Sequence, residues 1–153
     1  MTEAKGWRGE WLRGRALEIK IQRDRRIFVK VARNDFREVI ERLVKVEGFS
    51  RIATITGIDV GKEIEVIYHL TRKELVLSIS SRVPKEELVL PTIVDLIPGS
   101  AFYEREVHDL LGVLFDGNPD LSPLVLADGW PSDVHPLRKE WTSERIERRL
   151  EEP

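Results

Sequence analysis

The sequence predicts an α+β fold, in which an antiparallel or mixed sheet carries helices on one face and an extended, irregular C-terminal segment follows. Three observations predict it. Residues 27–31 and 49–83 contain runs rich in β-branched residues. Apolar residues recur at helical spacing between positions 36 and 44. Pro and Gly are frequent beyond position 112.

The chain of 153 residues has the length of one domain. We divide it into a basic N-terminal arm (residues 1–24), an α+β globular domain (25–112) and an extended C-terminal tail with a short terminal helix (113–153). The arm is rich in Arg and contains Trp7 and Trp11. We interpret it as a peripheral arm or an edge element. The two Trp residues either anchor an interface, where Trp is enriched, or fold back onto the chain's own core.

The globular part begins with a strand over Ile27–Val31, followed by a helix over residues 35–47. Asn34 is expected to cap the start of this helix, and Gly48 stands where a C-terminal glycine belongs. The apolar stripe of the helix is Phe36, Val39, Ile40, Leu43 and Val44. It predicts that the helix packs on a sheet.

Three strands are then expected, over residues 49–60, 63–70 and 74–83, with a tight turn at Gly61. They form an antiparallel meander with the helix on one face. Residues 84–98 favour two short helical turns or extended pieces.

A second helix is predicted over residues 101–111, capped by Ser100 and ended by Gly112 in a left-handed conformation. On this helix Arg105 and Asp109 are four residues apart and are expected to pair. Phe102, Leu110 and the 113–115 run are expected to bury against the sheet.

Residues 113–141 are predicted to be irregular because Pro and Gly recur there: Gly117, Pro119, Pro123, Gly129, Pro131 and Pro136. A stretch of this length without regular structure is unusual inside a compact domain. Its backbone groups need partners if they are buried. Packing along a neighbouring protein would supply them. Residues 143–151 are expected to form a charged terminal helix capped by Ser143.

Composition excludes several classes of site. The chain has no Cys, so it forms no disulfide and holds neither a thiolate-bound iron–sulfur cluster nor a Cys-type zinc site. The charged fraction of 34% with one Met is typical of hyperthermophile proteins. No apolar run is long enough to span a membrane. Residues 1–10 lack the apolar region of a signal peptide.

Charge is segregated along the chain. Residues 1–33 contain ten basic and four acidic residues, whereas residues 84–133 contain two basic and ten acidic residues. Such segregation favours oriented association with complementary surfaces.

Catalytic and metal sites find little support. Glu104 and His108 share a helix face, but His69 and His135 lack the spacing of metal ligands. A surface or interface His is therefore the favoured interpretation of His108. No serine lies in a nucleophile-elbow motif. We expect no catalytic residue, no cofactor and no metal.

The basic run Arg23, Arg25 and Arg26, together with the two Trp residues, leaves a different function open. It would suit a stand-alone RNA-binding α+β domain. Asp24 interrupts the run and no RNA-binding motif is present, so a solvated edge or protein interface is favoured.

A long ordered motif lies between Leu90 and Trp141. Its members are Glu104, Arg105, Glu106, Asp109, Gly112, Phe115, Pro119, Asp120, Leu121, Pro136, Leu137, Arg138 and Lys139. This series resembles the signature of the 30-kilodalton subunit (C subunit) family of respiratory complex I. The family includes homologues in energy-converting membrane-bound nickel–iron hydrogenases and related archaeal membrane complexes. The motif region covers about a third of the chain.

The resemblance implies a cofactor-free docking subunit that holds a hydrogenase-like large subunit and iron–sulfur subunits together. Its place would be the peripheral arm, on the cytoplasmic side of the cell membrane, reaching the membrane only through other subunits and binding no nucleic acid. The motif residues, Leu121 excepted, would lie at the subunit interface, and Arg138 offers a planar fork for carboxylates.

The sequence departs from the family pattern at Asn118, Pro123 and Glu140, where His, Arg and Asp are usual. With the thermophile-like composition, this favours an energy-converting hydrogenase-type or ferredoxin-linked complex. The alternative is the corresponding subunit of an NADH, F(420)H(2) or ferredoxin:quinone oxidoreductase.

Overall fold

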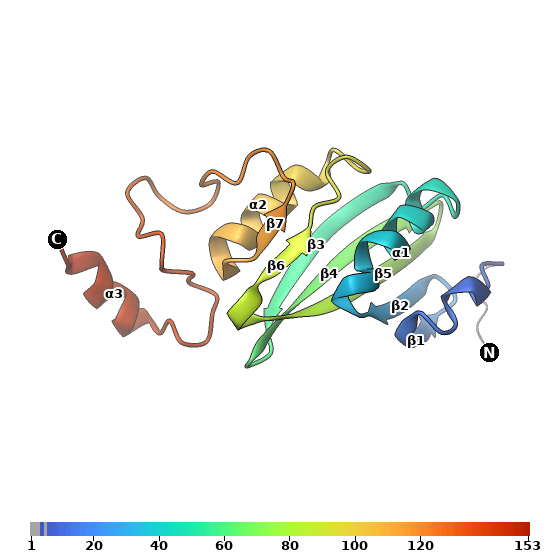
Figure 1. The fold of residues 1–153 in the computed structure, drawn as a ribbon, viewed down its shortest axis with the longest axis horizontal. Helices are drawn as coiled ribbons and strands as arrows, with labels where there is room; N and C mark the ends of the chain where they lie inside the picture. The colour runs from blue at the N-terminus through green and yellow to red at the C-terminus, as the bar shows by residue number, and fades with distance from the viewer. Residues whose placement is uncertain (1–3, 5) are drawn as a thin grey trace.

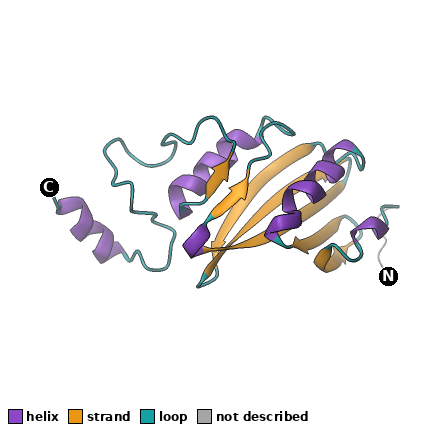
Figure 2. Cartoon of the chain, viewed as in Figure 1, coloured by secondary structure: helices purple, strands orange, loops and turns teal. Residues whose placement is uncertain are grey.

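The computed structural model describes residue 4 and residues 6–153, so residues 1–3 and 5 of the predicted arm lie outside it. Figures 1 and 2 show a twisted sheet with its helices, and an irregular segment that leads to a terminal helix. The elements in chain order are η1 Glu10–Leu12, β1 Ala16–Arg23, β2 Arg26–Val31, α1 Arg33–Lys45, β3 Arg51–Asp59, β4 Glu63–Arg72, β5 Leu75–Pro84, η2 Lys85–Glu87, β6 Val89–Pro91, α2 Ser100–Leu111, β7 Leu114–Asp116 and α3 Ser143–Glu151.

The main sheet has the strand order β1-β2-β5-β4-β3. Strands β3, β4 and β5 form the predicted antiparallel meander. Strand β2 joins the meander in parallel with β5, and β1 pairs antiparallel with β2 at the edge. The sheet is therefore mixed, and the predicted α+β class is confirmed.

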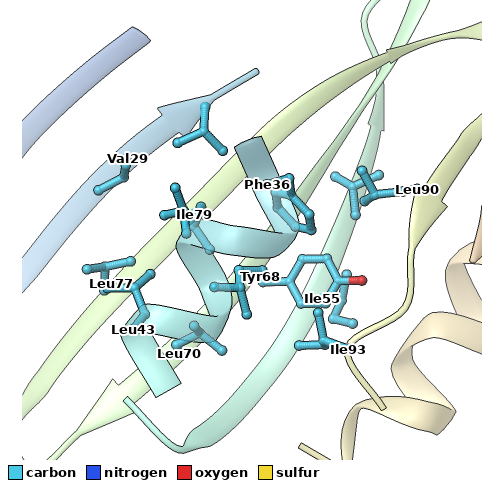
Figure 3. Close-up of a cluster of buried hydrophobic side chains, with 14 of the residues drawn as sticks. Val29, Phe36, Leu43, Ile55, Tyr68, Leu70, Leu77, Ile79, Leu90 and Ile93 are labelled. Atoms are coloured by element: carbon cyan, nitrogen blue, oxygen red, sulfur yellow. The ribbon is translucent and has the colours of Figure 1, made fainter. Parts of the chain in front are cut away.

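Helix α1 covers one face of the sheet, as its apolar spacing predicted. Phe36, Val39, Ile40 and Leu43 are buried against it. The rings of Phe36 and Tyr68 lie 5.2 Å apart, and leucine and isoleucine side chains from several strands, with Ile93, lie around them (Figure 3). Figure 3 thus shows the centre of the hydrophobic core.

The limits of α1 differ slightly from the prediction. The helix begins two residues earlier, at Arg33, and the capping position is Ala32 in an extended conformation. The predicted N-cap, Asn34, therefore lies inside the first turn. Gly48 has a φ of +79°, which lets the amide of Phe49 donate to the carbonyl of Leu43 at 2.9 Å. This is the C-terminal glycine that the sequence predicted.

The two N-terminal Trp residues pack on the chain's own core. Trp7 is buried, lies edge-on to Phe49 at 5.7 Å, and donates through Nε1 to Glu47 at 2.9 Å. Trp11 packs beneath the guanidinium of Arg42 at 4.6 Å. Of the two alternatives for these residues, the structure supports the core, and residues 16–23 form the edge strand β1.

Residues 84–98 contain one helical turn, η2, and one short strand, β6. Strand β6 pairs in parallel with β7, and the amide of Thr92 extends the pairing by donating to Asp116 at 2.9 Å. Val113 and Phe115 are buried, as expected, whereas Leu114 is exposed. Residues 114–116, near the start of the predicted tail, are therefore paired with β6 in a second, two-stranded sheet.

Helix α2 packs on the same face of the sheet as α1, over β3. Its buried stripe is Ser100, Glu104, Val107 and Leu111. The stripe meets Gly57 of β3, where a β-carbon would overlap the side chain of Leu111 and lie 3.2 Å from Val107 Cγ1. Gly57 therefore permits the close approach of helix and strand.

Two expectations for the N-terminal part of α2 are wrong. Phe102 is 62% exposed, because it lies on the face of the helix opposite the stripe, near the guanidinium of Arg105. Ser100 does not cap the helix; its hydroxyl donates to the carbonyl of Ile97 at 2.7 Å, and Gly99 occupies the capping position.

The terminal helix α3 spans residues 143–151, as predicted. Thr142, not Ser143, caps it by accepting from the amide of Arg145 at 3.3 Å. In Figure 1, α3 lies at one end of the long axis of the molecule and η1 lies near the other. Within the described residues no helix is long and apolar enough to cross a membrane.

Replacing Gly57 by Ala should destabilise the fold by about 1–3 kcal/mol, because the new methyl group overlaps the packed side chain of Leu111. Urea unfolding measures the change. Gly99→Ala is the control: its nearest neighbour is Ile52 Cγ2 at 4.0 Å, so the free energy of unfolding should change by less than about 0.5 kcal/mol. Equal effects of the two substitutions would contradict the close approach.

Candidate docking interface

The C-terminal segment, residues 113–153, runs back along α2 before it reaches α3 (Figure 1). Between β7 and α3, residues 117–142 contain no helix or strand. Hydrogen bonds to α2 and β3 hold this stretch, among them one from the amide of Leu137 to the carbonyl of Leu110 at 3.0 Å. Two buried carboxylates accept four of the others.

The first carboxylate is Asp109 of α2, which is buried. Its Oδ2 accepts hydrogen bonds from three consecutive amides, those of Leu124 and Val125 at 2.8 Å and of Leu126 at 3.3 Å. Burial by itself would raise the pKa of Asp109, but these amides outweigh it and the pKa lies below its usual value. The ionised carboxylate of Asp109 thus accepts hydrogen bonds from backbone amides of a loop that lies in no helix or strand.

The second carboxylate is Asp59, at the end of β3. Its Oδ2 accepts from Lys85 Nζ at 2.7 Å and from the amide of Lys139 at 2.8 Å, and its Oδ1 accepts from the amide of Gly61 at 2.9 Å. Burial opposes ionisation, yet the three donors lower the pKa of Asp59 to about 2. Asp59 therefore joins a strand, a 3-10 turn and the C-terminal segment.

The end of α2 fits closely against residues 135–138. Arg138 Nε donates to the carbonyl of Leu111 at 2.6 Å, and His135 Nδ1 lies 3.0 Å from the carbonyl of Asp109. Gly112 ends the helix with a φ of +78°, as predicted. A β-carbon there would lie 2.5 Å from Arg138 Nη2 and 2.7 Å from His135 Cδ2. Glycine is required both for the turn and for the space.

Arg105 does not pair with Asp109, contrary to the prediction. It donates to the carbonyls of Ser122 and Pro123, each at 3.1 Å, and lies 3.9 Å from Asp120. Helical spacing brought Arg105 and Asp109 to neighbouring positions, but each found partners in the C-terminal segment.

Glu104 is fully buried. Thr92 Oγ1 donates to its carboxylate, at 2.8 Å to Oε2. Burial raises the pKa of Glu104 to about 7, although the hydrogen bonds from Thr92 and Ile93 act in the opposite direction. Its negative charge in turn adds to the effect of burial in raising the pKa of Tyr68, whose hydroxyl has no partner among the described residues.

The twelve predicted interface residues divide by exposure. Exposed are Glu106, Pro119, Asp120, Leu137 and Lys139; partly exposed are Arg105, Gly112, Pro136 and Arg138; buried are Glu104, Asp109 and Phe115. The side chains of the last three pack inside the chain. Contact of the others with a neighbouring subunit stays a prediction.

Several large apolar side chains are exposed on α2 and the C-terminal segment. Most of the exposed large hydrophobic side chains of the described residues lie here: Phe102, Leu114, Leu124, Val125, Leu137 and Leu150. A cleft of about 300 Å³ opens between β3 and α2, lined by Thr54, Gly57, Glu106 and Leu137 among others. Exposed apolar surface of this kind is typical of a binding site.

The histidines make hydrogen bonds within the chain. His108 Nδ1 lies 2.8 Å from the carbonyl of Val113, and His69 lies between Thr56 Oγ1 at 3.0 Å and Ser78 Oγ at 2.7 Å. Across residues 4 and 6–153, no cluster of three or more His, Asp or Glu is placed to hold a metal ion.

Residues 29–147 match the family model described as the 30 Kd subunit of respiratory-chain NADH dehydrogenase. The chain belongs to this family. The match runs from β2 into α3 and includes every predicted interface residue. The recognition made from the motif between Leu90 and Trp141 is confirmed.

Two family relatives show how far the similarity extends. The C subunit of the F(420)H(2) dehydrogenase of Methanosarcina mazei is 30% identical over 81% of this chain and 80% of its own length. The C subunit of the NADH-quinone oxidoreductase of Acidothermus cellulolyticus is 36% identical over 61% of this chain. The matched region is half of the Acidothermus protein.

Two solved structures share the fold. A chain in the structure of the membrane-bound sulfane sulfur reductase, an archaeal respiratory membrane complex, matches with a TM-score of 0.77 and 29% identity, over 88% of this chain and 82% of the other. A trypsin-resistant fragment of Nqo5 matches with a TM-score of 0.63 and 30% identity, over 72% of this chain and 92% of the fragment.

Neutralising Asp59 should destabilise the protein at neutral pH. The pKa of this carboxyl falls from 3.8 to about 2 on folding. Its stabilisation of about 2 kcal/mol is therefore complete above about pH 4 and is lost as the pH falls through about 2. In urea unfolding, Asp59→Asn should be less stable than the unmodified chain near pH 7, and the difference should narrow near pH 3. Asp128→Asn, at an exposed position, should show neither effect.

Glu104 should produce the opposite dependence on pH. Because its pKa is raised from 4.5 to about 7 on folding, its stabilisation is complete below about pH 4.5 and is lost as the pH rises through 7. The unmodified chain should lose up to about 3 kcal/mol relative to Glu104→Gln between about pH 5 and pH 8. Glu106→Gln, exposed on the same helix, is the control and should leave the pH profile unchanged. Parallel profiles for the unmodified chain and Glu104→Gln would contradict this assignment.

Proposed function

We propose that this chain is a cofactor-free docking subunit in the peripheral arm of a complex I-related membrane oxidoreductase. It holds a hydrogenase-like large subunit and iron–sulfur subunits together. The observation that carries the proposal is the C-terminal segment: its shape is fixed by buried carboxylates, while its apolar side chains point to solvent.

Preorganisation of the C-terminal segment favours association. A long irregular segment that was mobile would lose conformational entropy on binding, which would weaken association. Asp59, Asp109 and Arg138 hold the backbone of this segment before any partner arrives. Leu124 and Leu137 remain exposed on it and are available for a neighbouring subunit. This is the arrangement expected of a docking surface.

We assign the redox chemistry of the complex to the neighbouring subunits. The chain has no Cys to ligate an iron–sulfur cluster, and the described residues include no metal-binding cluster. Electrons would pass through the large and iron–sulfur subunits, and this chain would fix their relative positions. It would lie on the cytoplasmic side of the membrane and reach the membrane only through other subunits.

We favour an energy-converting hydrogenase-type or ferredoxin-linked parent complex. The departures from the family pattern at Asn118, Pro123 and Glu140 support this, and a chain of the sulfane sulfur reductase, an archaeal respiratory membrane complex, shares the fold over most of both chains. The alternative is the equivalent subunit of a quinone-linked oxidoreductase, supported by the F(420)H(2) dehydrogenase and NADH-quinone oxidoreductase relatives. The metal ligands of the large subunit recovered with this chain would separate the two.

Charged substitutions on the docking surface should release the chain from its complex. In the full-length tagged chain, Leu124→Glu with Leu137→Glu places two carboxylates on a surface that is expected to be desolvated in the complex. We expect recovery of the large and iron–sulfur subunits from gently solubilised membranes to fall by about tenfold or more. Quantitative mass spectrometry of the purified material measures it.

Leu17→Glu is the matched control, because Leu17 is 70% exposed and lies on β1, away from the C-terminal segment. It should leave recovery unchanged, and all variants should unfold at the same temperature as the unmodified chain. Equal recovery with the double variant would contradict docking through this segment. Failure of the unmodified chain to bring down any membrane complex would contradict the proposed function itself.

A further inference from the structure

A row of basic residues crosses the main sheet at one end of its strands. The end of β1, the start of β2, the turn from β4 to β5 and the start of β3 all lie at this end. The strand pairs that show it are Arg23 with Arg26, Arg26 with Val76, Arg72 with Leu75, and Arg51 with Thr71. We call this row the basic rim. In the order of the strands its members are Arg23, Arg26, Lys73, Arg72 and Arg51.

Every strand of the sheet thus contributes a cation at or beside its end. Neighbouring strands are about 4.8 Å apart, so five strands extend the rim over roughly 20 Å. That length suits one protein contact. The acidic residues in the two rim turns are Asp24 and Glu74, and Glu74 lies 3.7 Å from Arg25. The rim as a whole remains positive.

Most of the rim cations have no partner. Arg23, Arg26, Arg51 and Lys73 are exposed, and among the described residues none of them makes a hydrogen bond or an ion pair. Arg72 is different: it donates to the carbonyl of Glu47 at 2.9 Å and lies over the ring of Phe49 at 5.0 Å. Arg72 anchors the rim to the end of α1, and the other four point their charge to solvent.

Several cations elsewhere in the molecule are used differently. Arg37 binds Asp95 through two hydrogen bonds of 2.6 Å, Lys85 binds Asp59, and Arg149 lies 3.0 Å from Asp133. Other exposed cations without a side-chain partner among the described residues, such as Lys20 and Lys62, lie off the rim, whereas the rim gathers four along one row. Their concentration in one row is what an electrostatic docking site requires.

We infer that the basic rim binds an acidic surface of a second protein, namely a neighbouring subunit of the same complex. The inference rests on the proposed docking role and adds a second interface to it. In Figure 1 the β1–β2 pair and α3 lie toward opposite ends of the long axis, so the chain would bridge partners at two ends. Three of the four free cations are Arg, whose planar guanidinium pairs with carboxylates through two hydrogen bonds.

A protein fits the rim better than a bilayer or a nucleic acid. Stable attachment to a bilayer needs an apolar or lipid anchor beside the charge, and binding of single-stranded nucleic acid uses aromatic side chains among the basic ones. The rim turns, residues 23–26 and 72–75, contain no aromatic residue, and their one large apolar residue, Leu75, is buried. Carboxylates on a folded surface need neither feature.

Zero-length cross-linking of the intact complex tests this contact. A carbodiimide joins a lysine amine to a carboxylate only where the two touch. Lys73 should form a cross-link to an Asp or Glu of another subunit, and Arg51→Lys should add a second. Lys62 is the matched control, because it is exposed and unpartnered at the opposite end of β3 from Arg51. Its cross-links to other subunits should be at least about fivefold weaker.

Charge reversal gives an independent measure. Arg51→Glu with Lys73→Glu should weaken retention in the complex by about tenfold, and the loss should shrink at high salt because screening already removes the attraction. Lys20→Glu with Lys62→Glu changes the net charge equally at exposed positions off the rim and should weaken retention by less than about twofold. Thermal unfolding of both variants should match that of the unmodified chain.

The outcomes separate the two proposals. If the chain co-purifies with its complex but Lys73 forms no cross-link and the rim variant is retained, the rim contact is wrong and docking through the C-terminal segment stands. Binding of the purified full chain to anionic phosphatidylglycerol vesicles or to RNA, abolished by the rim variant, would also overturn the inference in favour of those partners. If no complex is recovered with the unmodified chain, both proposals fail.

Discussion

The hydrogen bonds of Asp109 are the interaction on which the arrangement of the C-terminal segment depends. Residues 117–142 have no ladder of their own, and a backbone amide without a partner costs about as much as a lost hydrogen bond. One buried oxygen of Asp109 accepts from three consecutive amides. A single charge on a rigid helix thus replaces part of a secondary structure. Asp59 plays the same role near the other end of the segment, where its carboxylate accepts a hydrogen bond from the amide of Lys139.

The role of Asp109 depends on the position of α2, and therefore on the sheet. The stripe from Ser100 to Leu111 fixes the rotation of the helix, and Gly57 fixes its distance from β3. With the stripe buried, Asp109 points toward residues 124–126 and Phe102 points to solvent. The exposed apolar side chains are thus a consequence of how α2 packs.

Local pattern was sufficient for the parts of the fold in which one face is buried. The helical spacing from Phe36 to Leu43 and the run of β-branched residues to position 83 give α1 and the meander within a few residues. The parallel pairing of β2 with β5 left no local signal, because it joins segments about 50 residues apart. Capping was misplaced by one or two residues at Asn34, Ser100 and Ser143: Ala32 and Gly99 take the cap positions without a side-chain hydrogen bond, and only Thr142 supplies one.

The candidate site was predicted less well than the fold. The motif identified the family, but helical spacing alone suggested that Arg105 and Asp109 pair, whereas each binds the chain that lies across α2. Glu104 looked like an interface charge, and burial among Thr92 and Ile93 makes it a part of the core. Asp59 was missed because an Asp two residues before Gly61 looks like a turn residue. Asp59 is indeed a turn residue, because its Oδ1 accepts from the amide of Gly61. Its Oδ2, however, accepts from the amide of Lys139, 80 positions away.

Charge is used in two distinct ways at the two ends of the molecule. Around the C-terminal segment, several charged groups make hydrogen bonds within the chain that hold the segment in place. Lys85 binds Asp59, Arg138 binds the carbonyl of Leu111, and Arg105 binds residues 122 and 123. The large apolar side chains exposed there, Leu124, Val125 and Leu137 among them, would make contacts that are little affected by salt. At the basic rim the shape is already fixed by strand pairing, so the cations are free, and their attraction is screened over about 8 Å at physiological ionic strength. Two interfaces built in this way would respond differently to salt, so a rise in ionic strength should loosen the rim while the C-terminal segment remains bound.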